Sequence, residues 1–110
     1  MARGFETKCL HLEEEEGDCS HFGALSYPIY QTATYAHPGV GQSTGFDYSR
    51  LQNPTREHLE KIVASLENGI DAFAFTTGMA AITMLMELFA PGDHLIVDED
   101  LYGGSIRLFS

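Results

Sequence analysis

Residues 71–97, DAFAFTTGMAAITMLMELFAPGDHLIV, contain two short apolar runs on either side of a stretch with helical periodicity. The runs at 71–75 and 94–97 have the length and composition of buried strands. The apolar residues between them repeat at helical spacing: Ile82, Leu85, Met86 and Phe89. Pro91 and Gly92 then end that helix. Two buried strands joined by a helix are most simply parallel, with a right-handed crossover. The stretch therefore predicts a βαβ unit and an α/β fold with a doubly wound sheet.

A further helix is predicted just upstream of this unit. Asn53 is a good capping residue, and Pro54 suits the first helical position because its missing N–H would have no partner there. Asn68 and Gly69 are typical of a left-handed C-cap. One apolar stripe lies between these ends, at i, i+3, i+4 and i+7 spacing: Leu59, Ile62, Val63 and Leu66.

The chain divides into two regimes. Residues 1–52 carry no sustained period and hold most of the turn-forming residues, so we expect an extended N-terminal arm with loops. Its run of four glutamates, 13–16, is typical of a solvated face. Residues 53–110 are expected to begin a larger α/β domain, because two strands make only the start of a doubly wound sheet. The sequence thus reads as an N-terminal piece of a longer protein.

Composition restricts the classes of partner. The 110 residues carry 16 acidic and 6 basic side chains, for a net charge of −10. Such a surface repels phosphate backbones, so nucleic acid and anionic membrane are not expected partners. No apolar run has the length of a membrane span, and the N-terminus lacks a signal-peptide core. We expect a cytoplasmic protein in which any anion site is local, built from backbone amides and a few arginines.

The junction FTTGMAAI (75–82) is the first candidate for such a site. A helix that begins near Gly78 offers free backbone amides and the positive end of its dipole, and glycine lets a ligand approach the backbone closely. Thr76 and Thr77 would add hydroxyl donors or cap the helix. The alternative is an ordinary loop before a helix, capped by Thr77. The stretch is not a Walker loop, since it lacks the Gly-Lys-Ser/Thr ending.

A second candidate is DEDLYGGS (98–105), which follows the second predicted strand. Ligands of α/β proteins bind at the carboxyl ends of strands, where Tyr102 would present a ring able to stack on a planar ligand. Gly103 and Gly104 favour a tight backbone turn. A tyrosine that packs beside a glycine turn is the alternative.

The stretch FDYSRLQNPTR (46–56) places Tyr48 and Arg50 just before a helix start, and Asp47 is the one nearby residue able to neutralise Arg50. His37 and His58 show no partner pattern, and no nucleophile elbow is present.

The sequence also contains two Cys-x-His motifs, formed by Cys9 with His11 and by Cys19 with His21. Structural zinc sites usually separate paired ligands by two to four residues, so a zinc-bound interaction domain is a weak alternative and we expect no metal.

Five segments together resemble one family: GALSYPIYQTATY, FDYSRLQNPTREHLEKIVASLENG, AFAFTTGMAAI, PGDHLIV and DLYGGS. Their order and spacing are similar to those of the Cys/Met metabolism (transsulfuration) enzymes, which depend on pyridoxal 5'-phosphate. The resemblance implies the aspartate-aminotransferase-like fold, fold type I. It also implies that the amides of Gly78 and Met79 bind the cofactor phosphate. Tyr102 would stack on the pyridine ring, where its phenol would assist proton transfer or departure of the leaving group.

The resemblance further implies a homo-oligomer, a dimer of dimers, in which Tyr48 and Arg50 reach the phosphate of the neighbouring subunit. The implied reaction is β- or γ-elimination or replacement on amino acids derived from cysteine or homoserine, of the cystathionine γ-synthase or cystathionine β-lyase type. O-acetylhomoserine sulfhydrylase and the γ-lyases are alternatives. Gly104 stands where methionine γ-lyases usually have a cysteine, which disfavours that subtype.

The Schiff-base lysine and the aspartate that pairs with the pyridine nitrogen lie further along in this family. Lys8 is in the arm, and Lys61 is about 100° around the predicted helix from Ile62, on its solvent flank. The 110-residue chain is therefore expected to be inactive by itself. An inactive truncation product or a non-catalytic phosphate-binding module is the alternative function.

Overall fold

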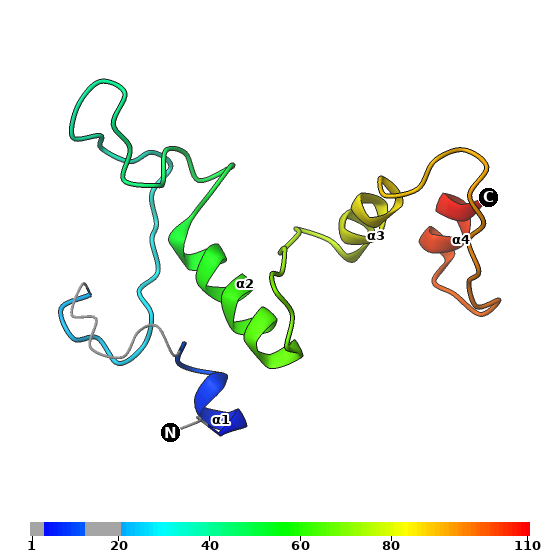
Figure 1. Ribbon diagram of the computed structural model, residues 1–110, viewed down its shortest axis with the longest axis horizontal. Helices are drawn as coiled ribbons and strands as arrows, with labels where there is room; N and C mark the ends of the chain where they lie inside the picture. The colour runs from blue at the N-terminus through cyan, green and yellow to red at the C-terminus, as the bar shows by residue number, and fades with distance from the viewer. Residues whose placement is uncertain (1–3, 13–20) are drawn as a thin grey trace. The chain divides into compact units, whose positions relative to one another are not determined.

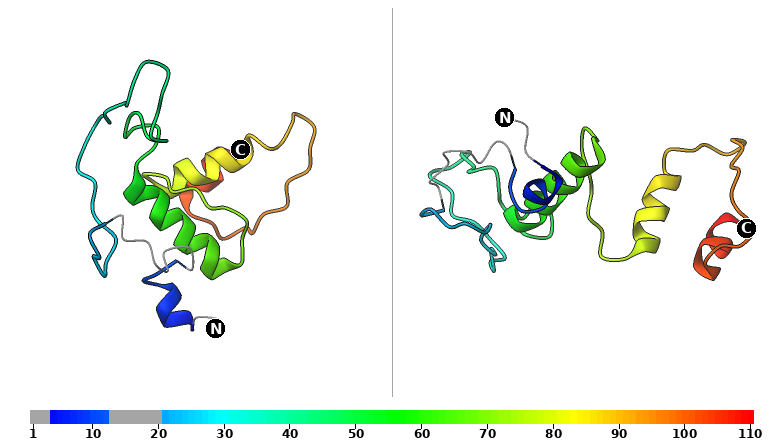
Figure 2. Two further views of the ribbon diagram at one scale, coloured as in Figure 1. Left: turned by 60° about the vertical axis from the view of Figure 1, so that its left-hand side comes forward. Right: turned by 90° about the horizontal axis from the view of Figure 1, so that it is seen from below.

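The computed structural model describes residues 4–12 and 21–110. The chain forms two compact units, Met1–Phe73 and Ala74–Ser110. The first contains α1 (Phe5–Lys8) and α2 (Pro54–Glu67), and the second contains α3 (Gly78–Met86) and α4 (Gly103–Phe109) (Figures 1 and 2). The expected boundary at residues 52 and 53 lies inside the first unit. That boundary separates an N-terminal arm from the start of a larger domain, which is a different division from that into two compact units. It therefore stays a prediction.

Helix α2 has the ends that its sequence predicts. Asn53 is extended, with φ of −145°, and its side chain accepts a hydrogen bond from the Thr55 amide as N-cap. Pro54 occupies the first turn, where it has no N–H to satisfy. At the other end Asn68 takes the left-handed conformation, with φ of 54°. The Gly69 amide then donates to the Ala64 carbonyl at 2.9 Å, which satisfies one of the last carbonyls of the helix.

The start of α2 also fastens the preceding arm. The Asn53 side-chain amide donates to the Tyr30 carbonyl at 3.2 Å and to Ser49 Oγ at 3.1 Å. In return, the Tyr30 amide donates to Thr55 Oγ1 at 2.9 Å. Two segments that are distant in sequence, around residues 30 and 49, are thereby held at the first turn of α2.

Residues 33–49 form a loop whose two ends lie side by side (Figure 1). Thr34 and Tyr48 form an isolated antiparallel bridge at its base. Two backbone hydrogen bonds flank the bridge, from Ser49 to Ala33 at 2.9 Å and from Tyr35 to Asp47 at 3.3 Å. The described part of residues 1–52 thus contains a closed loop and the short helix α1.

Helix α3 begins as predicted but ends early. Thr77 is its N-cap, and Thr77 Oγ1 accepts from the Ala80 amide at 3.0 Å. The helix ends at Met86, and the next residues continue as tight turns in which the Phe89 amide donates to the Met86 carbonyl. Phe89 therefore lies beyond the helix that its spacing predicted.

The prediction of a glycine turn at Gly103 and Gly104 is wrong, since both residues lie in the first turn of α4. The sequence after them, SIRLF, contains residues compatible with a helix, and glycine is tolerated at a helix start, where packing contacts decide the conformation. Tyr102 precedes the helix without a side-chain capping bond.

The two predicted strands, 71–75 and 94–97, do not form, and no strand occurs anywhere in residues 4–12 and 21–110. Their burial is also mispredicted, because Phe73 is 74% exposed and Ile96 is 96% exposed. A strand needs neighbouring strands to bond its N–H and C=O groups, and neither segment has one among the described residues. The βαβ unit is therefore corrected to a helix between two irregular segments.

Little apolar surface is buried in either unit. Ala64 and Pro54, both on α2, are the buried residues with apolar side chains in the part of the chain that the structure describes. The predicted stripe on α2 is partly uncovered, with Leu59 and Val63 exposed although α1 packs against this helix. No helix among the described residues has the length and apolar character to cross a membrane. Because isolated helices of this length are marginal in water, caps contribute much of their stability.

The double role of Asn53 gives a testable prediction. Asn53→Asp keeps an oxygen to cap α2 but loses the amide that donates to Tyr30 and Ser49, so α2 should persist while the arm detaches. Asn53→Ala loses both functions and should also destabilise the helix by about 1 kcal/mol. Backbone chemical shifts report the helix, and hydrogen exchange of the Tyr30 amide reports the arm. If both variants change the chemical shifts and the hydrogen exchange equally, the capping bond and the bonds to Tyr30 and Ser49 cannot be separated.

Candidate functional site

The N-terminus of α3 presents two unpaired amides. Thr77 Oγ1 accepts from the third amide of the helix, that of Ala80. The amides of Gly78 and Met79, at the first two positions, have no acceptor among the described residues. A Cβ built on Gly78 would meet nothing within 4 Å, so the approach to these amides is open. Two donors at the positive end of a helix dipole suit an anion, and the Thr77 cap leaves both of them available.

The ring of Tyr102 lies beside Met79. A Cβ placed on Gly104 would lie 2.7 Å from Tyr102 Cε1 and 3.0 Å from Met79 Sδ, so both side chains meet above the Gly104 backbone. Helices α3 and α4 pack together at this point. Tyr102 remains 75% exposed, which leaves part of its ring free for a ligand. The second unit therefore brings together three residues that the sequence predicts for one site: Gly78, Met79 and Tyr102.

Ser105 belongs to the same cluster and was not singled out from the sequence. It is buried, and its hydroxyl lies 3.7 Å from Met79 Sδ, a weak acceptor. Its amide donates to the Tyr102 carbonyl at 2.8 Å. Ser105 thus links Tyr102 to Met79, whose amide has no acceptor among the described residues. Nothing in its local spacing indicated this, since the contact joins two helices.

Tyr48 and Arg50 form a pair in the first unit. The Arg50 guanidinium lies over the Tyr48 ring, with Cζ 5.1 Å from the ring centroid, as in a cation–π contact. Arg50 is exposed and makes no ion pair with any residue that the structure describes. Its charge is therefore available to an outside anion. This pair and the cluster of Gly78, Met79 and Tyr102 lie in different units, each described by itself.

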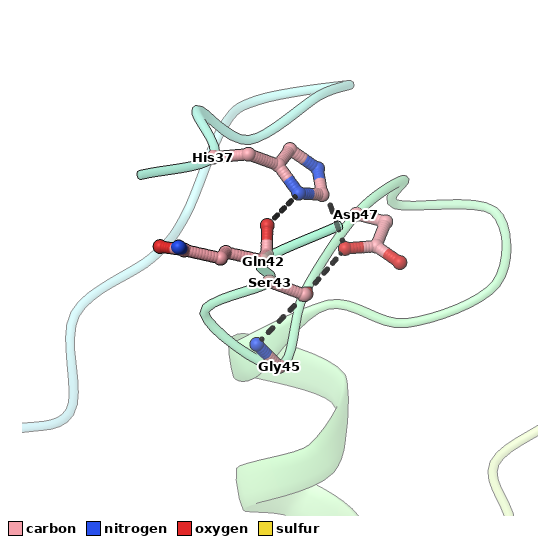
Figure 3. A network of polar contacts seen from close by, with 5 residues as sticks. All are labelled: His37, Gln42, Ser43, Gly45 and Asp47. Atoms are coloured by element: carbon pink, nitrogen blue, oxygen red, sulfur yellow. Dashed lines mark hydrogen bonds and ion pairs between the residues drawn. The ribbon is translucent and has the colours of Figure 1, made fainter. Parts of the chain in front are cut away.

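The loop before Tyr48 is closed by a polar network that the sequence did not predict (Figure 3). His37 Nδ1 lies 2.6 Å from the Gln42 carbonyl, and because a carbonyl only accepts, Nδ1 carries the proton. His37 Nε2 lies 3.4 Å from Asp47 Oδ1, a contact that is an ion pair when Nε2 carries a proton as well. Ser43 Oγ donates to the same oxygen at 2.5 Å and accepts from the Gly45 amide at 3.1 Å. His37 therefore has two partners that no sequence pattern indicated, because the closed loop brings these residues together.

His58 also has a partner. Its ring stacks on Tyr27 with centroids 3.8 Å apart and 10° between the planes, a contact between distant positions that the local sequence does not indicate. His21, one member of the weak zinc alternative, lies with Nδ1 3.1 Å from the Tyr30 hydroxyl. Cys9 is exposed, and Cys19 lies outside the described residues. No group of three residues with metal-binding side chains occurs in the described part of the chain.

A cavity of about 450 Å³ lies beside α1 and α2, and its lining includes none of the predicted site residues. Both lysines of the chain line it, and the Lys61 ammonium lies 2.7 Å from Glu57 Oε1. The other lining residues are mainly small or apolar: Leu12, Ala64, Ser65, Gly69, Ile70 and Asp71. Neither Tyr48 nor Arg50 contributes to it, so we do not assign the site there.

Comparison with known proteins gives a consistent result. The family described as Cys/Met metabolism PLP-dependent enzyme matches residues 6–110. The chain is 49% identical to a cystathionine gamma-synthase/O-acetylhomoserine (thiol)-lyase of Bacillus subtilis (strain 168), covering 99% of the chain and 29% of that protein. It is 56% identical to a cystathionine gamma-synthase of Haemophilus influenzae, over 78% of the chain and 23% of that protein. The chain thus spans less than a third of the length of these relatives.

Solved structures agree. A cystathionine gamma synthase from Xanthomonas oryzae pv. oryzae, in complex with aminoacrylate and cysteine, matches with a TM-score of 0.84 and 34% identity. The match covers 99% of this chain and 28% of that one. A cystathionine gamma-lyase from Lactobacillus plantarum complexed with L-serine matches with a TM-score of 0.79 and 40% identity, over 97% and 27% of the two chains. The chain is therefore similar in structure to a little more than a quarter of each of these enzymes.

The close approach at Gly104 gives a second prediction. Gly104→Ala should displace the Tyr102 ring from Met79, because a Cβ there would lie well inside van der Waals distance of both side chains. Gly103→Ala is the matched control, since a Cβ at Gly103 meets nothing within 4 Å and both changes raise helix propensity by about 1 kcal/mol. Nuclear Overhauser contacts between the Tyr102 ring and the Met79 methyl group measure the effect. Equal contacts in both variants would rule out a steric role for Gly104.

Proposed function

Because the chain belongs to the family of Cys/Met metabolism PLP-dependent enzymes, we propose that it supplies part of a pyridoxal-phosphate site. The complete enzyme would act on amino acids derived from cysteine or homoserine. One observation carries the proposal for this chain. The free amides of Gly78 and Met79 open at a helix N-terminus in the same unit in which the Tyr102 ring and the Met79 sulfur both lie close to the Gly104 backbone.

The second unit suits the two ends of the cofactor. The phosphate would accept from the Gly78 and Met79 amides, where the dipole of α3 favours a negative group and the absent Cβ of Gly78 leaves room. The exposed face of Tyr102 would stack on the planar ring. When bound, pyridoxal phosphate withdraws electrons from the substrate carbon next to the amino group.

Tyr102 has a second proposed role, as the catalytic residue of this chain. Its phenol Oη would hold or move a proton close to the ring on which it stacks, and so assist proton transfer or departure of the leaving group. Because Gly104 has no Cβ, the ring can lie close to the backbone there, and this placement would set the position of that oxygen.

Tyr48 and Arg50 would complete the phosphate site of a neighbouring subunit in a homo-oligomer. Their cation–π contact and the lack of an ion pair on Arg50 among the described residues support this role. A guanidinium binds phosphate through two parallel N–H donors, which is stronger than a contact between neutral groups.

The similar proteins do not point to a single reaction subtype. We favour the cystathionine γ-synthase or β-lyase type, with O-acetylhomoserine sulfhydrylase and the γ-lyases as alternatives. The similar proteins have names of several subtypes, including a cystathionine beta-lyase of Lactococcus lactis at 51% identity. Gly104, which lies under the Tyr102 ring, is the local feature that disfavours the methionine γ-lyase subtype.

A hybrid enzyme tests the proposed function. Residues 1–110 replace the segment that they match in the Bacillus subtilis relative, and the purified hybrid is titrated with pyridoxal phosphate and assayed for activity. Cofactor binding and turnover support the proposal. A folded hybrid that fails to bind the cofactor would exclude it and favour a non-catalytic phosphate-binding module.

Arg50→Ala in this hybrid should weaken pyridoxal phosphate binding by at least about tenfold, the effect of losing one or more charge-assisted hydrogen bonds. The subunits should remain folded, because Arg50 has no structural ion pair among the described residues. Arg107→Ala is the control, since it removes an equal charge from an exposed site on α4. Equal cofactor affinity in the two variants would remove Arg50 from the phosphate site.

The isolated 110-residue chain should form no stoichiometric adduct with pyridoxal phosphate at a single lysine. Its lysines, Lys8 and Lys61, line the cavity beside α1 and α2, and Lys61 is paired with Glu57. Borohydride reduction followed by peptide mass spectrometry measures the adduct. One fully modified lysine would instead show that the chain carries its own covalent site.

A further inference from the structure

Asp47 is the one acidic residue between positions 21 and 56, a segment that also contains Arg50 and Arg56. It lies three residues before Arg50 in the sequence. Arg56 already contacts Glu60 on α2, with Nε 3.6 Å from Oε1. Asp47 is therefore the carboxylate that would compete with an outside anion for Arg50.

The Asp47 carboxylate is held by other groups. Its Oδ1 accepts a hydrogen bond of 2.5 Å from Ser43 Oγ and lies 3.4 Å from His37 Nε2. Asp47 makes no ion pair with Arg50, although both residues are exposed and described. The guanidinium lies over the Tyr48 ring instead. The two charges thus have separate partners in spite of their closeness in sequence.

The two groups that hold Asp47 are themselves fixed by the backbone of the loop. His37 Nδ1 donates to the Gln42 carbonyl at 2.6 Å, and this bond orients Nε2 toward Asp47, with which the ring forms an ion pair when Nε2 also carries a proton. Ser43 Oγ accepts from the Gly45 amide at 3.1 Å, which turns its proton toward the carboxylate. Figure 3 shows both side chains converging on one oxygen of Asp47.

We propose that Ser43 and His37 are positioning residues that keep the Asp47 carboxylate away from Arg50, and so reserve the Arg50 charge for a bound phosphate. The inference rests on the proposed function, since it assigns a determinant of cofactor affinity to residues that do not touch the cofactor. Asp47 by itself would weaken the site. The polar network around it removes that competition.

Removing the two holding groups should therefore expose the competition. In the hybrid enzyme, His37→Ala with Ser43→Ala frees Asp47 to pair with Arg50, and an exposed ion pair of this kind should weaken pyridoxal phosphate binding about two- to fivefold. Gln42→Ala is the control on the same loop, because its contact with His37 uses the backbone carbonyl and survives the change.

The decisive variant adds Asp47→Asn to the pair of substitutions. The asparagine has no charge to offer Arg50, so the triple variant should recover the starting affinity, and Asp47→Asn alone should not weaken binding. If the network only tied the loop together, Asp47→Asn would weaken binding and the triple variant would stay as weak as the double. Either of those results overturns the proposal, as does unchanged affinity in the double variant.

A second readout uses the 110-residue chain without cofactor, so that it does not depend on the proposed function. The side-chain Nε–H signal of Arg50 should shift and exchange more slowly in the double variant, and it should return to its starting position when Asp47→Asn is added. Failure of the starting hybrid to bind cofactor would count against the proposed function alone. An Arg50 signal that is unaffected by the double variant would count against the inference.

Discussion

The side chain of Asn53 is the contact on which the first unit depends. Its oxygen caps α2, and its amide bonds the Tyr30 carbonyl and the Ser49 hydroxyl. Each hydrogen bond contributes only about 1 kcal/mol, but little apolar surface is buried among the described residues to contribute more. Because Ser49 stands between Tyr48 and Arg50, the same side chain that starts the helix also fixes the residues proposed to bind phosphate.

The sequence predicted those features that depend on neighbouring residues. The caps of α2 and α3 follow from Asn53 and Thr77, since a capping bond closes within three residues. The segments 71–75 and 94–97 were mispredicted because a strand is stabilised by chain that lies beside it, and the described residues provide none. Their apolar composition indicates that they would be buried if neighbouring chain covered them. It does not determine the secondary structure that they adopt here.

In the candidate site, too, the features set by neighbouring residues were predictable and those set by distant residues were not. The free amides of Gly78 and Met79 were predictable, because any helix start leaves such groups and Thr77 occupies a different amide. The meeting of Tyr102, Met79 and Ser105 was not, since it requires α4, and a pair of glycines favoured a turn there. The His37 network was hidden for a similar reason, as its members face one another only after the loop closes.

The net charge of −10 appears to oppose a phosphate site only if charge is averaged over the chain. Between residues 21 and 56 there is a single carboxylate, and it accepts a hydrogen bond from Ser43 of its own loop. Electrostatic attraction over a few ångströms depends on which charges are free at that place, because salt screens the more distant ones. An acidic protein can therefore hold a phosphate without a basic surface, provided that the nearest acid already has a partner.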